Sequence, residues 1–457
     1  MIMKFSALTL AVAVAVAVSG CSFIPTHERP VAPVPAAFPG QVADAAAGAA
    51  LPAWETVVAD ARLRELISLA LQNNRDLRVA ALRMEQVRAE YQIRRADGLP
   101  TLNLAASGNR QPNGNGGISS TYTAGLTMAG WELDFFGRVA ALKESALAQY
   151  LASEEARRAA QTSLVAAVAN GWLALQADEE LLALTRRTLV TREDSQRLTK
   201  LRLDNGVASA LDLRQAESLA AAARSTQTQL QRSRALNLNA LTLLLGQVPP
   251  VALLPTADAP LAVLRPVPEG LPSDLLIRRA DIRQAEQSLI AANANIGAAR
   301  AAFFPRISLT AGVGTASSEL SGLFKGGSWG FTLAPQAVLP IFDAGRNQAN
   351  LDSAKVGRDI AIAQYEKAIQ TAFREVADAL AGRATLDDQL RDLQLQAAAD
   401  AERLRLTELR YRGGVASSLD WLDAQRSLFA TQQSLTQLKL AQQQNQVALY
   451  KALGGGY

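Results

Sequence analysis

Prolines divide this chain into segments that can form long helices and segments that cannot. No proline occurs between Pro112 and Pro249, and none follows Pro340. Because proline lacks a backbone N–H and clashes with the preceding turn, a stretch without it is free to form one continuous helix. Within both stretches apolar residues recur every seven positions, a spacing that predicts coiled-coil-like packing. These residues are Val168, Leu175, Leu182 and Leu189, and then Leu390, Ala397, Leu404 and Tyr411.

One unit of roughly 200 residues occurs twice, a period far longer than that of solenoid repeats. Residues 206–212 read GVASALD and residues 414–420 read GVASSLD, at an offset of 208. We assign repeat 1 to 54–248 and repeat 2 to 273–457, joined by a proline-rich linker at 249–272 that cannot be a helix interior. Each repeat is expected to hold a helix, a β-hairpin (101–134 or 306–340) and a long helical hairpin with its tip near 206 or 414.

The expected helices differ in length by about a factor of two. The long ones, 138–204 and its counterpart in repeat 2, would each extend about 100 Å at 1.5 Å per residue. The chain would then reverse at Asn205-Gly206 and at Gly413-Gly414, where glycine adopts the dihedrals of a tight turn. The returning helices (209–245, 417–453) and the initial helices (62–96, 273–302) are each about half as long. Stacked end to end, the short helices could pair along each long one.

Short segments between the helices alternate apolar and small polar residues, as strands with one apolar face do. They are 102–104, 122–128, 307–313 and 329–333. Such strands suit the lipid-facing wall of a barrel, although two soluble hairpins would show the same pattern. Four strands cannot close a barrel, and open sheet edges in lipid leave backbone groups unpaired. We therefore expect an oligomer, and the sequence alone permits a dimer, a trimer or more.

The N-terminus carries an export signal. Residues 1–20 form a signal peptide in which Lys4 precedes a short apolar run, and Val18-Ser19-Gly20-Cys21 resembles a bacterial lipobox. We expect Cys21 to be acylated and to become the new N-terminus, and Ser22 after it indicates sorting to the outer membrane. More than one acyl chain anchors a protein stably. Residues 21–53 would form a proline-rich tether.

Composition excludes several classes of function. The 46 basic and 42 acidic residues nearly balance, so nucleic acid is not an expected partner. One cysteine and one histidine allow neither a disulfide within the chain nor a His- or Cys-rich metal site. No catalytic motif is recognisable, and Gly312-Val313-Gly314 opens no helix, so we expect no enzymatic activity and no cofactor.

Ordered motifs extend through essentially the whole chain after Cys21. Together they resemble the TolC-like outer-membrane factors, most closely the lipoprotein branch that serves multidrug pumps of the resistance–nodulation–division type. The motifs are Trp54, the Leu66–Ala70 stretch with Asn74 and Leu77, Arg279-Ala280-Asp281, residues 304–309 (FPRISL), 340–346 (PIFDAGR) and 450–456 (YKALGGG).

The resemblance implies a mainly α fold with a membrane β part. Three copies would form a homotrimer with a twelve-stranded β-barrel and a periplasmic α-barrel of long helices. The chain would serve as a passive duct for drugs or other small molecules, assembled with a periplasmic adaptor and an inner-membrane pump. The hairpin tips would contact the adaptor through Asn205, Gly206, Val207, Gly413, Gly414 and Val415.

The resemblance also implies a gate near the second tip. Asp420 and Asp423 match acidic rings that narrow the periplasmic entrance, although carboxylates at a helix N-terminus are also favoured by the helix dipole. Tyr411 and Asp212 match a tyrosine and an aspartate that lock the gate across hairpins. An arginine that joins this lock in some members is replaced here by Ala416.

Two other readings remain at this stage. The duct could instead serve a type I protein secretion system. A lipid-anchored periplasmic adaptor also uses long helical hairpins, but it carries a single hairpin within a lipoyl-like β domain. The duplicated hairpin and the amphipathic strands favour the duct.

Overall fold

The computed structural model describes residues 22–35, 38, 53–113, 116–257, 276 and 278–455. The signal peptide, Cys21 and most of the linker lie outside these residues. The chain forms two compact units, each assembled from segments of both repeats. Of the described residues, unit 1 comprises those up to 32 with 82–155 and 283–367, and unit 2 comprises those within 33–81, 156–282 and 368–455.

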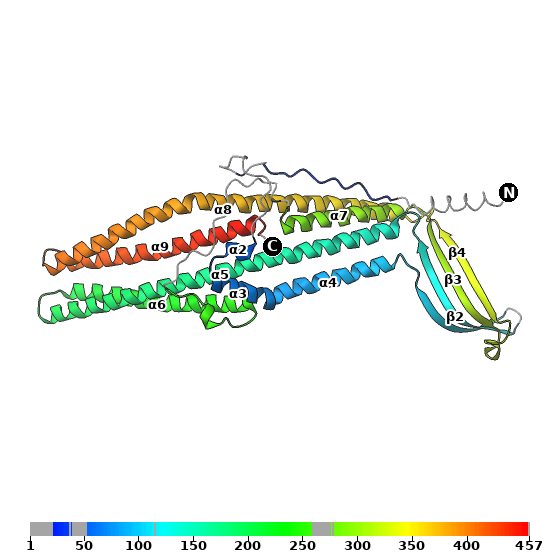
Figure 1. The fold of residues 1–457 in the computed structure, drawn as a ribbon, viewed down its shortest axis with the longest axis horizontal. Helices are drawn as coiled ribbons and strands as arrows, with labels where there is room; N and C mark the ends of the chain where they lie inside the picture. The colour runs from blue at the N-terminus through cyan, green and yellow to red at the C-terminus, as the bar shows by residue number, and fades with distance from the viewer. Residues whose placement is uncertain are drawn as a thin grey trace. The chain divides into compact units, whose positions relative to one another are not determined.

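Two helical hairpins dominate the fold, as expected from the proline-free stretches (Figure 1). Helix α5 (Arg138–Asp204) is followed by α6 (Ala210–Leu245), and α8 (Arg346–Arg412) by α9 (Ser418–Ala452). Along α5 the residues of the seven-residue spacing pack inward, and Val168, Leu175 and Leu182 are at most 2% exposed. Among the described residues, none of the helices combines the length and the apolar character needed to span a bilayer.

The first helical segment is interrupted, whereas the sequence predicted one helix over 62–96. A short helix α2 (Trp54–Val57) precedes α3 (Ala61–Asn73), and α4 (Arg75–Ala96) follows it. The break falls at Asn74, whose ψ of 129° is extended rather than helical. Its side-chain oxygen accepts the backbone N–H of Leu77 at 2.8 Å, so Asn74 caps α4 at the point where α3 ends. In repeat 2 the corresponding helix is α7 (Ala280–Ala301).

The four strands form one antiparallel sheet in the order β1-β2-β3-β4. They are β1 (Leu102–Pro112), β2 (Ile118–Leu133), β3 (Arg306–Ser317) and β4 (Trp329–Val338). Strands β2 and β3 pair with each other, so the two hairpins join into one continuous sheet. Strands β1 and β4 are left at its two edges (Figure 1).

The register of the sheet separates an apolar face from a polar one. One row of paired residues is Leu104, Leu126, Val313 and Phe331, and their side chains are 40–83% exposed. The adjacent row, Asn103, Thr127, Gly312 and Thr332, points to the opposite face. The sheet therefore presents a broad exposed apolar surface on one side.

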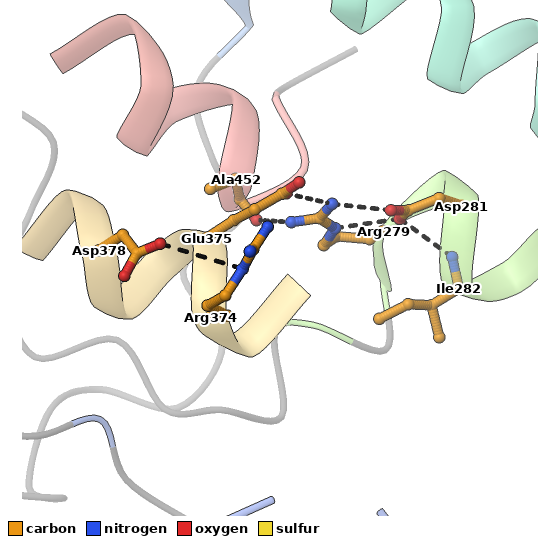
Figure 2. A network of polar contacts seen from close by, with 7 residues as sticks. All are labelled: Arg279, Asp281, Ile282, Arg374, Glu375, Asp378 and Ala452. Carbon is orange, nitrogen blue, oxygen red and sulfur yellow. Dashed lines mark hydrogen bonds and ion pairs between the residues drawn. The ribbon is translucent and has the colours of Figure 1, made fainter. Parts of the chain in front are cut away.

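Equivalent points of the two repeats hold their returning helices in place. In repeat 1 the Asn74 amide donates to the Leu244 carbonyl oxygen at 2.8 Å, near the end of α6. In repeat 2 the buried Arg279 donates from Nη1 to the Ala452 carbonyl oxygen at 2.6 Å, at the end of α9. Its guanidinium also binds Asp281 and Glu375 (Figure 2). The distances from Nη2 to their carboxylate oxygens are 2.7 and 2.8 Å.

Candidate functional site

The turns of the two helical hairpins have the same backbone geometry. After α5, the N–H of Val207 donates to the Arg202 carbonyl at 2.8 Å and Gly206 has φ 74°. After α8, Val415 donates to the Arg410 carbonyl at 2.9 Å and Gly414 has φ 75°. Both are Schellman turns, in which a left-handed glycine lets the chain reverse while the last helical carbonyls stay paired. The two predicted tip regions thus form matching turns.

Each returning helix begins with a capping box. The Ser209 hydroxyl accepts the N–H of Asp212 at 3.1 Å, and the Asp212 carboxylate accepts the N–H of Ser209 at 2.9 Å. Ser417 and Asp420 repeat this reciprocal pair at the start of α9, with distances of 3.1 and 3.2 Å. Hydrogen bonds from the Ser417 hydroxyl and then its backbone N–H hold the pKa of Asp420 below its ordinary value. Asp420 therefore carries a negative charge at neutral pH while it caps the helix.

Two side-chain bonds join the first hairpin to the second just behind the turns. Arg202 of α5 donates to the Tyr411 hydroxyl of α8 at 2.6 Å, and its guanidinium lies 5.0 Å from the centre of that ring. The Ser418 hydroxyl of α9 donates to the Asp212 carboxylate of α6. The Tyr411 ring also stacks on Trp421 at 4.9 Å between centroids. These contacts fix the two hairpins against each other at this end of unit 2.

The predicted gate residues Tyr411 and Asp212 both lie where the two hairpins join, but they are not bonded to each other. Within the described chain no hydrogen bond connects Tyr411 to Asp212, since each bonds to a different residue of the other hairpin. Ala416 supplies no guanidinium to the predicted lock. In the structure Arg202 provides a guanidinium to Tyr411, and only the packing of α5 against α8 could reveal that pairing.

Asp423 lies one turn beyond Asp420 and has different surroundings. Its carboxylate binds Arg403 of α8 at 2.7 Å and also contacts Arg426 on its own helix. Two cations therefore accompany Asp423, whereas the close contacts of Asp420 are those of its capping box. Of the two acidic positions, Asp420 is the one whose charge is not held in an ion pair within the described chain.

The tips themselves expose apolar side chains in symmetric positions. Val207 and Val415 are 63% and 68% exposed, and Leu211 and Leu419 are 67% and 57% exposed. Asn205 donates to the Leu201 carbonyl at 2.7 Å, and Gly413 donates its N–H to the Leu409 carbonyl at 3.0 Å. The Asn205 side-chain amide and the Gly413 backbone N–H thus bond within their own hairpins, while the four apolar side chains remain exposed.

A buried arginine that was not predicted from the sequence lies behind the tips. Arg192 of α5 is 4% exposed, donates to the Leu219 carbonyl at 3.0 Å and lies 4.9 Å from the centre of the Phe429 ring. Burial lowers its pKa, because removal from water disfavours the charged form. A single arginine inside a seven-residue pattern gives no sign that it is buried, so sequence alone could not identify it.

Neither a metal site nor the predicted lipid anchor can be placed in this structure. No cluster of three or more histidine, cysteine, aspartate or glutamate residues with metal-binding geometry occurs in the described ranges. Cys21 lies outside them.

Comparison with known proteins identifies the family. The sequence model described as Outer membrane efflux protein matches residues 66–247 and 271–455. The chain is 48% identical over 469 residues to the probable efflux pump outer membrane protein TtgC of Pseudomonas putida, covering 100% of this chain and 96% of that protein. The chain therefore belongs to the outer membrane efflux protein family.

Solved structures agree with this assignment. A membrane protein from Pseudomonas aeruginosa superposes with a TM-score of 0.90 at 45% identity, covering 96% of this chain and 98% of that one. The open state of the Neisseria gonorrhoeae MtrE outer membrane channel gives a TM-score of 0.86 at 42% identity, over 95% and 98% of the two chains. The fold is that of an outer-membrane channel subunit, and the protein acts in efflux across the outer membrane.

Proposed function

We propose that this chain is the passive outer-membrane duct of a tripartite efflux system that exports drugs or other small molecules. The observation that carries the proposal is the exposed apolar face of the four-stranded sheet in a chain that otherwise consists of long helical hairpins. Strands with one apolar face can cross a bilayer when every backbone group is paired. The polar opposite face would then line a water-filled passage.

The proposed working unit is a homotrimer. Strands β1 and β4 lie at the sheet edges, and an open edge within lipid costs several kcal/mol for each unpaired group. Pairing β4 of one copy with β1 of the next removes both edges. Three copies give twelve strands, whereas about eight are the fewest that close such a barrel. The many half-exposed apolar residues of α4 and α8 would be covered by neighbouring copies.

We further propose an acylated Cys21 as a second attachment to the outer membrane. Its support is the lipobox-like sequence, and peptide mass spectrometry should find an acylated N-terminus in the mature protein. The partners proposed are a periplasmic adaptor, bound at the exposed tips around Val207 and Val415, and an inner-membrane pump beyond it. No catalytic role is proposed for any residue.

The gate is proposed to lie at the turn of the second hairpin. In a trimer Asp420 and Asp423 would each become a ring of three carboxylates that attracts cations at the entrance. The contacts to Arg403 and Arg426 offset the charge of Asp423, so Asp420 should contribute more of the selectivity. The contact between Arg202 and Tyr411 would hold the two hairpins in the narrowed state.

Single-channel recording tests the gate. The double variant Asp420→Ala/Asp423→Ala should raise conductance modestly and weaken both cation selectivity and block by divalent ions. Asp387→Ala/Asp388→Ala, which removes the same charge from α8 at a distance from the turn, should leave selectivity unchanged. If the first variant keeps wild-type selectivity and block, these aspartates only cap and stabilise α9, and the constriction lies elsewhere.

Genetic complementation tests whether the chain acts as the duct of an efflux system. Deleting the gene should sensitise the bacterium to pump substrates, and a plasmid copy should restore resistance. Cross-linking in mild detergent should give three subunits. A type I protein secretion role remains the second candidate, and loss of a secreted protein with unchanged drug resistance would favour it instead.

A further inference from the structure

A cleft opens in unit 1 where the sheet meets the helices. It has a volume of about 490 Å³ and lies where α4 ends, β1 begins, β2 ends and α5 begins. Sites for small molecules typically measure about 300–1,000 Å³, so the cleft is large enough for a headgroup and the first part of an acyl chain. Its walls include Leu99, Trp131, Leu133 and Phe135.

A β-bulge directs Trp131 to the apolar face of the sheet. Met128 pairs with Ala311, but Trp131 pairs with Leu309, so β2 contains one more residue than β3 between these pairs. Gly130 accommodates the irregularity with φ 63° and donates its N–H to the Thr310 hydroxyl at 3.2 Å. Without the extra residue, the alternation of the strand would place Trp131 on the polar face. The cleft therefore continues the exposed apolar surface of the sheet.

Basic side chains surround this apolar wall. Arg94, Arg95 and Lys143 line the cleft and are exposed. Arg94 binds Asp97 at 3.3 Å, but no ion pair engages Arg95 or Lys143 within the described ranges. Two free positive charges beside an apolar wall complement a ligand with an anionic head and a hydrocarbon tail.

The acidic residues of the cleft are already engaged. Glu132 contacts Arg138 at 2.6 Å and Arg306 at 2.6 Å, and it belongs to the polar face of the sheet, paired with Ser308. The Asp134 carboxylate accepts the N–H of Ala140 at 2.7 Å, which places its charge at the N-terminus of α5. Neither carboxylate neutralises Arg95 or Lys143 directly.

We propose that this cleft binds one phospholipid with an anionic headgroup, at the periplasmic boundary of the outer membrane. The inference rests on the proposed membrane-spanning role of the strands, whose helix-proximal ends would then lie at headgroup depth. The phosphate contacts Arg95 and Lys143, while an acyl chain lies against Trp131 and Leu99. Tryptophan suits this position, since its ring is apolar and its N–H, here bonded to the Gly98 carbonyl at 3.4 Å, is polar.

Native mass spectrometry of the purified full-length oligomer tests the proposal, with phosphatidylglycerol and phosphatidylcholine of equal chain length as probes. Arg95→Gln/Lys143→Gln should weaken phosphatidylglycerol binding about 25-fold, at about fivefold for each cation. Phosphatidylcholine binding should change by less than about twofold. The control Arg187→Gln/Lys200→Gln removes the same charge from exposed positions of α5 and should change neither. Trp131→Ala should weaken both lipids.

The possible outcomes separate this proposal from the proposed function. If trimers do not form or do not insert into membranes, the duct proposal fails, and lipid binding is measured only on trimers. If trimers form but the cleft variant and its control behave alike, the lipid site is wrong and the duct stands. Maleimide labelling of Lys143→Cys tests whether a second copy of the chain, and not a lipid, fills the cleft. Protection that persists after complete delipidation would show that a second copy of the chain fills the cleft, which also overturns the lipid site.

Discussion

The two repeats solve one structural problem with different chemistry. Each must hold the end of its returning helix beside the start of a short helix, and each does so by donating a hydrogen bond to a helix-end carbonyl. Repeat 1 uses the neutral amide of Asn74, which also caps α4. Repeat 2 uses the charged Arg279, which requires Glu375 and Asp281 beside it. Backbone geometry is preserved between the repeats, while the side chain that maintains it is not.

The charged Arg279 depends on its hydrogen-bonding partners in a way that the neutral Asn74 does not. Burial acts to lower the pKa of Arg279, but the hydrogen bonds and charges of Asp281 and then Glu375 outweigh it and raise the pKa. A buried guanidinium without these carboxylates would be strongly destabilising. Asn74 needs no charged partner, since a neutral amide costs less free energy to bury once it is hydrogen-bonded. Repeat 2 is therefore the more sensitive one to a substitution at this position.

The largest expected effect on the free energy of unfolding comes from removing the side chain of Arg279, compared with that of Asn74. Arg279→Ala should cost about 3 kcal/mol, because it removes a buried side chain, leaves the Ala452 carbonyl unpaired and takes the shared cation from Asp281 and Glu375. Asn74→Ala should cost about 1–2 kcal/mol. Thermal unfolding of both variants measures the difference, and Arg279→Ala/Glu375→Gln should recover part of the loss. Equal midpoints for the two single variants would contradict the contrast between the repeats.

An effect smaller than that of Arg279→Ala is expected at the glycines that follow the returning helices. A Cβ on Gly246 (φ 68°) would lie 2.5 Å from the Asn73 carbonyl oxygen, whereas on Gly454 (φ 105°) its nearest neighbour is the Arg279 Cγ at 3.4 Å, an ordinary van der Waals contact. Gly246→Ala should cost about 2–3 kcal/mol and Gly454→Ala about 1 kcal/mol. Here repeat 1 is the more sensitive one. Gly357→Ala in α8, with nothing within 4 Å, serves as the control and should not destabilise.

The smallest effect concerns the capping aspartates at the two tips. Hydrogen bonds from Ser209 and then Ser418 lower the pKa of Asp212, so its contribution is present above the ordinary value of 3.8 and is lost as pH falls. Protection factors of the amides at both tips, which correct for the pH dependence of intrinsic exchange, should therefore fall below about pH 4. At neutral pH Asp212→Asn should raise exchange in both hairpins, since it loosens the bond to Ser418, and Asp420→Asn in its own hairpin only. Identical exchange patterns for the two variants would show that the contact between hairpins contributes nothing.

Much of the fold follows from local sequence rules. The expected long helix over 138–204 coincides with α5, because the stretch lacks proline, repeats its apolar residues every seven positions and ends at a glycine turn. The Ser209 and Ser417 caps likewise obey a short-range pattern. The initial helix was less well predicted. The helical pattern of 62–96 continues through Asn74, and the break there depends on a hydrogen bond to Leu244, 170 residues away in the chain.

The sequence by itself determined the repeat, the two long helices, the positions of the strands and the family, since each depends on spacing along the chain. Only the tertiary structure decided which residues far apart in the chain contact each other. Arg202 binds Tyr411 from a position 209 residues away, and Arg279 reaches Ala452 from 173 residues away. A one-residue bulge likewise decides which face of the sheet carries Trp131. The physical reason is that periodicity fixes the direction of a side chain on its own element, while its partner is set by how separate elements pack.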